Sequence, residues 1–256
     1  MKSRAITSST RWQTFCIYGP SGGGKSTLAA TAPRPYVLDS NQGLLSIAGR
    51  GGFEHVRGDE VHGMKDLDEV YDNCTGTGTA DWSKKFNTIV FDHFDDIQGI
   101  IMDGLADKAA ERDDRREVDE LQQKEYGVMG NKLRRYLRKF KKVPMHKILI
   151  CAEKSEFETG RLRPSLIGAL KDQLPYFCDH TMYLRIGKKG VRYLHLDPTD
   201  DFYAKTRAWW LPPELRKIRI DFDNTTALTT LFDRIAAGPK RSTPSSRRST
   251  ESSSKE

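Results

Sequence analysis

The chain has 256 residues and a formal net charge of +7, from 42 lysines and arginines against 35 acidic residues. This length is sufficient for one α/β domain with a buried core, so the fold does not need a disulfide or a metal as a staple. No run reaches the roughly 18 apolar residues of a membrane helix, and the first residues lack the apolar core of a signal peptide, which argues against a membrane or secreted protein. The four cysteines show no metal-ligand spacing, so we expect reduced thiols in a cytoplasmic protein. The positive charge is compatible with a nucleic-acid partner without proving one.

Short apolar runs alternate with helical patterns along the chain. Four runs are predicted to be buried strands, because they are rich in β-branched or aromatic residues and too short for helices: 15–18, 36–39, 88–92 and 147–152. Apolar residues at helical spacing occupy 97–105 and 133–140. This alternation predicts an α/β fold with a mostly parallel central sheet flanked by helices. Residues 181–196 are typical of a β-hairpin, and a final helix is predicted over 225–237.

The two ends of the chain differ from the middle in composition. Residues 238–256 are rich in Ser, Pro and charge and contain no large apolar side chain. Such a segment cannot bury enough surface to offset its ordering entropy, so we predict a disordered basic tail. The predicted organisation is a flexible N-terminus over 1–11, one domain over 12–237, and this tail.

The strongest motif is a phosphate-binding loop. Residues 19–26 match the pattern G-x-x-x-x-G-K-[ST], follow a predicted strand and open a helical run over 26–32. Glycines allow backbone N–H groups to surround phosphate oxygens, and a helix N-terminus favours negative charge. We expect Lys25 to contact the β- and γ-phosphates of ATP and Ser26 to bind Mg²⁺. The predicted nucleotide-binding residues are Gly19, Pro20, Ser21, Gly22, Gly23, Gly24, Lys25, Ser26 and Thr27.

The strand over 88–92 ends in a carboxylate, Asp92. An apolar strand that delivers an aspartate about 65 residues after a phosphate loop is typical of the second nucleotide motif of this class of protein. We therefore predict that Asp92 holds Mg²⁺ together with Ser26, most simply through water.

Six sequence blocks, in this order, resemble the phage ATPases of the Sak-four single-strand annealing group, which has a shortened RecA-like core. They are GPSGGGKSTLAA, YVLDSNQG, FNTIVFDHFDDIQ, YGVMGNKLRRYLRKFKKVPMHKILICAEKSE, RLRPSLIGALKDQLPYFCDH and YAKTRAWWLPPEL, within residues 12–220. The resemblance implies a RecA-like P-loop NTPase in which the strand over 147–152 lies between the phosphate-loop strand and the Asp92 strand. It also implies ATP, Mg²⁺, single-stranded DNA and a homo-oligomer. A phage-encoded protein would work in the bacterial cytoplasm, with a phage or host single-strand-binding protein as a further candidate partner.

The sequence departs from this family at one position. RecA-like ATPases usually carry a glutamate two residues past the aspartate that ends the second strand, where it polarises the attacking water. By that alignment, Asp39 ends the strand and Asn41 occupies the glutamate position. An amide holds water but is not a useful general base, so Asp39 and Glu153 are the alternatives for this role. Glu153 also matches the family's γ-phosphate sensor. ATP binding is therefore a firmer prediction than rapid hydrolysis.

Lys205 and Arg207 resemble a K-x-R element of RecA-like oligomers, in which both side chains reach the γ-phosphate held by the neighbouring subunit. Cationic charge at that point stabilises the charge that develops during phosphoryl transfer. A solvated basic pair near the end of a strand is the alternative interpretation.

The predicted contacts with DNA lie after the strand over 147–152. Arg161, Arg163 and Lys171 follow this strand, in a segment that Gly160 and Pro164 mark as a loop. Loops at the carboxyl ends of parallel strands commonly bind ligands, and the resemblance places single-stranded DNA there. The basic helix over 132–142 and the basic tail are competing surfaces, although charge opposite an apolar stripe is more typical of a solvated face.

The leading interpretation is an ATP-binding recombination protein of phages that binds single strands and promotes annealing or pairing, with Mg-dependent hydrolysis. A small-molecule kinase on the same phosphate loop, with Asp39 as its base, is the second. A nucleotide-gated DNA-binding scaffold with little turnover is the third, and Asn41 favours it.

Overall fold

The computed structural model describes residues 12–111 and 123–239. The strands are β1 (Thr14–Gly19), β2 (Pro35–Asp39), β3 (Arg57–Glu60), β4 (Thr88–Asp92), β5 (His146–Ser155), β6 (Leu162–Pro164), β7 (His180–Ile186), β8 (Arg192–His195), β9 (Lys205–Thr206) and β10 (Lys217–Ile220). The helices are α1 (Lys25–Ala29), α2 (Met64–Thr75), α3 (Phe94–Ala110), α4 (Gln123–Phe140), α5 (Leu170–Phe177) and α6 (Ala227–Ala236). Short 3-10 turns are η1 (Gly43–Ser46), η2 (Lys188–Gly190) and η3 (Pro213–Leu215).

One sheet forms the centre of the molecule, with the strand order β10-β8-β7-β1-β5-β4-β2-β3 and with β6 and β9 added at β5 and β7. The strands from β3 to β7 along this order are parallel to their neighbours, whereas β8 and β10 are antiparallel. The predicted α/β class and mostly parallel sheet are confirmed. β5 pairs with β1 on one side and β4 on the other, so the strand order implied by the resemblance is also confirmed.

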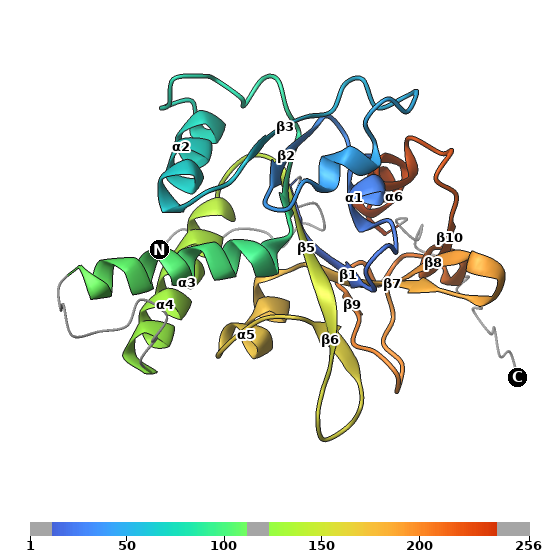
Figure 1. Cartoon of the computed structure of the whole chain (residues 1–256). Helices are drawn as coiled ribbons and strands as arrows, with labels where there is room; N and C mark the ends of the chain where they lie inside the picture. The colour runs from blue at the N-terminus through green and yellow to red at the C-terminus, as the bar shows by residue number, and fades with distance from the viewer. Residues whose placement is uncertain (1–11, 112–122, 240–256) are drawn as a thin grey trace, which may run out of the picture.

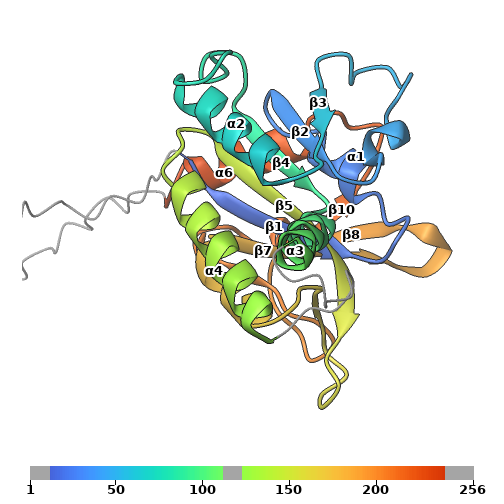
Figure 2. The same cartoon turned by 60° about the vertical axis from the view of Figure 1, so that its left-hand side comes forward.

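Helices cover both faces of the sheet and form one large core on each face. Neighbouring residues of β1 point to opposite faces, as the twofold periodicity of a strand requires. Cys16 and Tyr18 pack in the core beneath α2, α3, α4 and α5, whereas Phe15 and Ile17 pack beneath α1 and α6. Figure 1 shows α1 and α6 on the opposite side of the sheet from α3 and α4, and Figure 2 shows α3 end-on beside α4. The buried runs predicted as strands thus lie between two helical layers.

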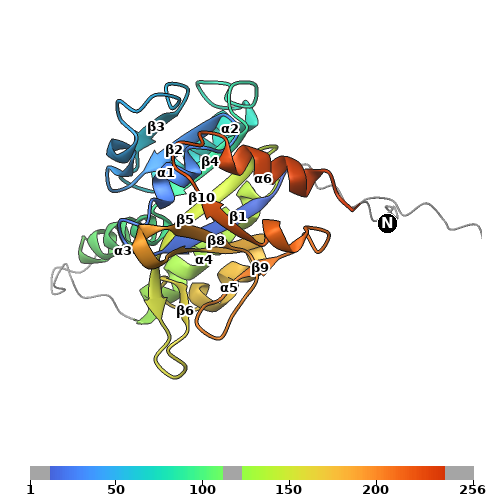
Figure 3. The ribbon, with the colours of Figure 1, turned by 90° about the vertical axis from the view of Figure 1, so that its right-hand side faces the viewer.

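The predicted C-terminal hairpin is formed by β7 and β8, with η2 at its turn. It continues the central sheet, because β7 pairs in parallel with β1 through Phe15–His180 to Tyr18–Tyr183. β10 pairs with β8 and ends this side of the sheet, as Figure 3 shows from the right-hand side of Figure 1. The final helix, predicted over 225–237, is confirmed as α6 with slightly shorter bounds.

Two local expectations need correction. The helical run predicted over 26–32 is the five-residue α1, because Pro33 and Pro35 follow and the chain must leave the helix before them. The segment expected to be a loop after 147–152 is instead a β-hairpin: β5 continues to Ser155 and pairs with β6. Pro164 lies in β6, an added strand where a missing amide is tolerated.

The predicted flexible N-terminus and the tail from residue 240 onward lie outside the described residues, so these domain boundaries stay predictions. Among the residues described, no helix combines the length and the apolar character that crossing a bilayer requires.

Candidate nucleotide and nucleic-acid sites

The loop between β1 and α1 has the conformation that its glycines permit. Gly22 and Gly24 have φ angles of 68° and 90°, in the region that favours glycine. The ammonium of Lys25 is buried and donates to the carbonyls of Gly19 at 3.1 Å and Pro20 at 3.0 Å. The loop therefore folds around the cation that we expect to contact phosphate.

The electrostatic surroundings of Lys25 combine burial with nearby carboxylates. Burial lowers the pKa of Lys25, while the charges of Asp92, Asp95 and Glu153 raise it. These three carboxyl groups thus act on the same ammonium, which places them around the phosphate loop.

The end of β4 offers oxygen atoms that fit a magnesium ion. Asp92 is fully buried, and neither of its carboxylate oxygens has a hydrogen-bond partner among the residues that the structure describes. A Cβ built on Gly43 would lie 2.7 Å from Asp92 Oδ2 and 3.0 Å from Ser26 Oγ, so these two oxygens share one cradle. Carboxylate and hydroxyl oxygens are ligands that Mg²⁺ prefers. Burial raises the pKa of Asp92, and a cation would offset that cost.

The segment after β2 closes this cradle. Asp39 accepts hydrogen bonds from the amides of Gly43 at 2.8 Å and Leu44 at 3.0 Å, one on each carboxylate oxygen. Asp39 therefore fixes the start of η1 and holds Gly43 over Asp92. Asn41 Nδ2 donates to Asp96 Oδ2 at 3.0 Å and lies 3.0 Å from His93 Nδ1, so its amide faces the start of α3.

Two further carboxylates lie at the carboxyl end of β5. Glu153 accepts a hydrogen bond from the Tyr183 hydroxyl at 2.9 Å. Asp95, in the first turn of α3, accepts from the amide of Ala152 at 3.2 Å through Oδ2. The sequence analysis missed Asp95, whose position three residues after Asp92 was its only signal.

Arg192 and Phe222 are other residues that the sequence analysis missed. Arg192 Nε donates to the carbonyl of Gly23 in the phosphate loop at 3.0 Å. The guanidinium lies 5.0 Å from the centre of the Phe222 ring, and a Cβ on Gly24 would be 2.2 Å from that ring. These contacts depend on the pairing of β7 with β1, because that pairing places β8 beside the phosphate loop. No sequence motif predicts this pairing.

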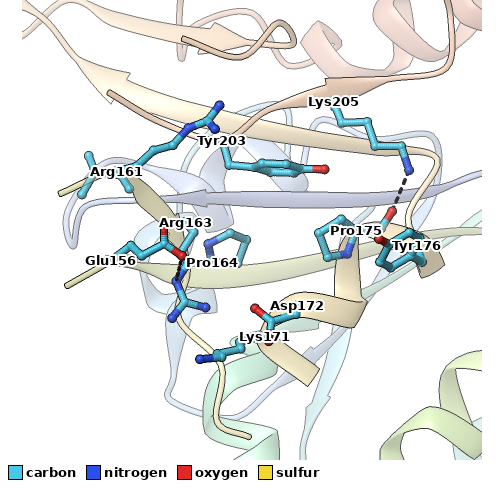
Figure 4. A pocket seen from close by; sticks show the side chains of 11 residues that line it. Glu156, Arg161, Arg163, Pro164, Lys171, Asp172, Pro175, Tyr176, Tyr203 and Lys205 are labelled. Atoms are coloured by element: carbon cyan, nitrogen blue, oxygen red, sulfur yellow. Dashed lines mark hydrogen bonds and ion pairs between the residues drawn. The ribbon is translucent and has the colours of Figure 1, made fainter. Parts of the chain in front are cut away.

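The three residues predicted to contact DNA converge on one pocket. Its volume is about 460 Å³. The β5–β6 hairpin contributes Arg161 and Arg163, and α5 contributes Lys171 and the exposed Tyr176. Tyr203 comes from the chain before β9, and Lys205 begins β9. In the view of Figure 4, the Lys171 side chain lies below the Arg163 guanidinium, and the Tyr203 ring lies above both.

The cations of this pocket differ in their contacts. Within the described part of the chain, Nε and Nη1 of Arg163 have no hydrogen-bond partner, and Nε lies 3.9 Å from Glu156 Oε1. Arg161 donates to the Phe202 carbonyl at 3.3 Å, and its guanidinium lies 5.8 Å from the Tyr203 ring centre. Lys205 donates to the Pro175 carbonyl at 2.7 Å, at the end of α5. Among these pocket cations, the partly buried Arg163 thus has more buried donors without a partner than Arg161 has.

A family model described as an AAA domain matches residues 11–208. The chain belongs to this AAA-domain family. Among solved structures, the crystal structure of the RadB recombinase matches with 17% identity and a TM-score of 0.43, covering 72% of this chain and 79% of that chain. No curated protein matches the chain.

In this AAA domain, Arg207 follows β9 and lies near the amino ends of β7 and β1, whereas the phosphate loop follows the carboxyl end of β1. Its guanidinium pairs with Asp179 at 2.9 Å. Thr206 pairs with His180 in β7, and His180 pairs with Phe15 of β1, whereas the phosphate loop begins at Gly19. Four residues of strand span roughly 13 Å, so Lys205 and Arg207 lie far from the phosphate loop of their own chain.

The basic face of α4 carries contacts within the AAA domain itself. Arg134 donates to Gln173 Oε1 at 3.0 Å. Lys139 pairs with Asp68 at 3.3 Å and lies 3.7 Å from the Tyr71 ring centre. The apolar stripe of this helix, Leu133, Leu137 and Phe140, is buried. These contacts favour a solvated supporting helix over a DNA surface.

Proposed function

We propose that this AAA domain is an ATP-dependent DNA-recombination protein of the phage Sak-four type, which binds single-stranded DNA and promotes annealing or strand pairing. One observation carries the proposal: the three residues that the sequence nominates for DNA line a single pocket, and β5 joins this pocket to the phosphate loop. Residues 19–27 bind ATP, and Ser26 and Asp92 hold Mg²⁺. The proposed place of action is the cytoplasm of a bacterial host.

β5 gives the two sites a direct mechanical link. Ala152 of β5 pairs with Gly19, the first residue of the phosphate loop, and Glu153 pairs with Pro164 of β6. A shift of the β5 end on ATP binding therefore moves Arg163, which is only one residue away from Pro164. This link supports DNA binding that depends on the bound nucleotide.

We also propose that the protein works as a homo-oligomer. Lys205 and Arg207 lie away from the phosphate loop of their own chain, so any contact of theirs with a nucleotide requires one held by another subunit. A head-to-tail arrangement of subunits supplies that geometry. A phage or host single-strand-binding protein is a further partner on the same proposal.

The contacts of Asp39 argue against the alternative of a small-molecule kinase. A general base needs an oxygen free to accept a proton, but both oxygens of Asp39 hold backbone amides. The nucleotide-gated scaffold with little turnover differs from our proposal only in the hydrolysis rate, which the following experiment measures.

The test of the nucleotide site is ATP hydrolysis with and without single-stranded DNA. We expect DNA, and no nucleoside, to stimulate turnover, and Lys25→Ala to weaken Mg-ATP binding sharply. Turnover stimulated by a nucleoside instead would identify a kinase, and unaltered ATP binding by Lys25→Ala would refute the phosphate-loop assignment.

The test of the DNA site is fluorescence anisotropy with an oligonucleotide at several salt concentrations, with and without ATP. Replacing both Arg161 and Arg163 with Ala should flatten the plot of log affinity against log salt by about 1.4, because each lost contact contributes about 0.7. The matched control replaces the exposed Arg135 and Arg138 of α4 with Ala. A larger loss in the α4 control would move the DNA to that helix.

A further inference from the structure

The proposed hydrolysis needs a carboxylate that activates water, and the usual position for it holds Asn41. Among the residues that the structure describes, we consider three carboxylates near the phosphate loop, apart from the proposed metal ligand Asp92: Asp39, Glu153 and Asp95. Asp39 and Glu153 already accept hydrogen bonds from other groups of the protein. Asp39 uses both oxygens to hold the amides of η1, and Glu153 accepts the Tyr183 hydroxyl.

Asp95 differs from these carboxylates in its surroundings. Its Oδ2 accepts the amide of Ala152, which fixes the side chain. Its Oδ1 is buried and has no hydrogen-bond partner in the described ranges 12–111 and 123–239. A buried carboxylate oxygen without a partner is costly, so such an atom in a native fold calls for a function or a bound molecule.

Asp95 lies beside the strand that pairs with the start of the phosphate loop. Ala152, which holds the carboxylate, pairs with Gly19, where that loop begins. The charge of Asp95 also acts on the ammonium of Lys25, which we expect at the β- and γ-phosphates. Asp92 ends β4, and α3 begins two residues later at Phe94, so the junction between β4 and α3 supplies both carboxylates.

We propose that Asp95 is the general base of ATP hydrolysis in this protein, in the role that a glutamate at the position of Asn41 performs in related ATPases. The proposal rests on the hydrolysis proposed above. Asp95 accepts a proton from water while the water oxygen forms a bond to the γ-phosphorus. The bond between that phosphorus and the bridging oxygen breaks, and its electron pair leaves on ADP. The products are ADP and inorganic phosphate, and the proton passes from Asp95 to solvent.

The amide of Asn41 contacts residues that flank Asp95. It donates to Asp96 and lies beside His93, both at the start of α3. An amide cannot remove a proton from water, so Asp95 supplies the basic oxygen that Asn41 lacks.

The decisive variant is Asp95→Asn, which keeps an oxygen for the Ala152 amide and removes the basic group. General-base catalysis contributes about 10²- to 10⁴-fold, so hydrolysis should fall at least about 100-fold. Binding of a fluorescent ATP analogue with Mg²⁺ should change by less than about threefold, because the Lys25 and Asp92 contacts remain. After incubation and separation, the nucleotide bound to the variant should be ATP, whereas the unaltered protein should hold ADP.

Two comparisons separate this role from a structural one. Asp103→Asn, an exposed aspartate on the same helix, should hydrolyse ATP at the normal rate. Asp95→Glu keeps a carboxylate and should recover part of the activity that Asp95→Asn loses. The melting temperature of Asp95→Asn should not fall, because burial raises the pKa of this carboxyl and the amide removes a poorly solvated charge.

Several outcomes would overturn the proposal. They are normal hydrolysis by Asp95→Asn, loss of nucleotide binding together with hydrolysis, and loss of hydrolysis in Glu153→Gln but not in Asp95→Asn. Absence of turnover in the unaltered protein, with and without DNA, would instead refute the proposed hydrolysis, and the role of Asp95 with it. Nucleotide binding by that protein would then support the scaffold.

Discussion

Gly43→Ala tests the proposed magnesium site without removing a ligand. The backbone tolerates alanine there, because Gly43 begins η1 and its φ lies outside the left-handed region that favours glycine. The new methyl group would lie 2.7 Å from Asp92 Oδ2 and 3.0 Å from Ser26 Oγ, in the space between the two oxygens that we assign to the ion.

The size of the effect follows from the distances. Ordinary contact begins near 3.5 Å, so the methyl group and Asp92 must separate by about 0.8 Å. Gly43 cannot simply retreat, since its amide is held by Asp39 at 2.8 Å. A displacement of about 1 Å in a preorganised site can cost about 100-fold, so we expect the Mg²⁺ concentration at half-maximal nucleotide binding to rise about 10- to 100-fold.

The assay is a Mg²⁺ titration of fluorescent ATP-analogue binding, with a melting curve of each protein. Gly51→Ala is the matched control, because a Cβ at Gly51 meets nothing within 4 Å. Gly43→Ala should melt at a somewhat lower temperature, as overpacking typically costs about 1–3 kcal/mol. Equal Mg²⁺ requirements in the two variants would refute the cradle of Asp92 and Ser26.

Three further predictions concern other parts of the chain. Asp39→Ala should lower the unfolding free energy by about 0.5–2 kcal/mol, as loss of a capping group does, and an unchanged urea midpoint would contradict this. It should also raise the Mg²⁺ concentration needed for nucleotide binding, because Gly43 is released. Arg207→Ala should slow ATP turnover while keeping nucleotide binding, and mixing it with Lys25→Ala should restore activity; a strictly additive loss in mixtures would exclude action between subunits. His180 is buried, and burial lowers its pKa to about 4, so only the unfolded state, with a pKa near 6.5, binds a proton between these values. The unfolding free energy should therefore fall, by up to about 3 kcal/mol, as the pH drops from 6.5 to 4, and His180→Gln should flatten this dependence in urea titrations at pH 7 and 5; an equally steep loss in the variant would assign it to other groups.

Much of the fold could be predicted because its signals are local. The strands over 88–92 and 147–152 are continuous apolar runs of β-formers. They are apolar on both faces because they lie between two helical layers, and such runs are recognisable in the sequence. The hairpin over 181–196 was equally visible from its glycine-bounded turn. By contrast, β3 consists of Arg57 to Glu60, which no hydrophobicity rule assigns to a strand; it forms because β2 offers a parallel partner. The helix α5 contains Pro175 and was likewise not expected.

The candidate sites divide in the same way. The phosphate loop and Asp92 are predictable from sequence, because their residues are adjacent in the chain or end a strand. The convergence of Arg163, Lys171 and Tyr203 on one pocket depends on how β6, α5 and the chain before β9 pack, and no spacing rule describes that. Asp95 was missed for a related reason. Its proximity to the phosphate loop depends on its hydrogen bond to Ala152 and on the pairing of Ala152 with Gly19, and neither is visible in the sequence.

The two strands that end the central sheet carry a consequence for association. β3 presents Arg57, Asp59 and Glu60, and β10 presents Lys217 and Arg219. Charged side chains on edge strands oppose the docking of a foreign strand, because pairing would desolvate them. A crowded solution of this protein should therefore resist amyloid-like stacking along the sheet. Replacing Lys217 and Arg219 with Thr would leave the nucleotide loop intact and expose a bare edge, where light scattering should report aggregation.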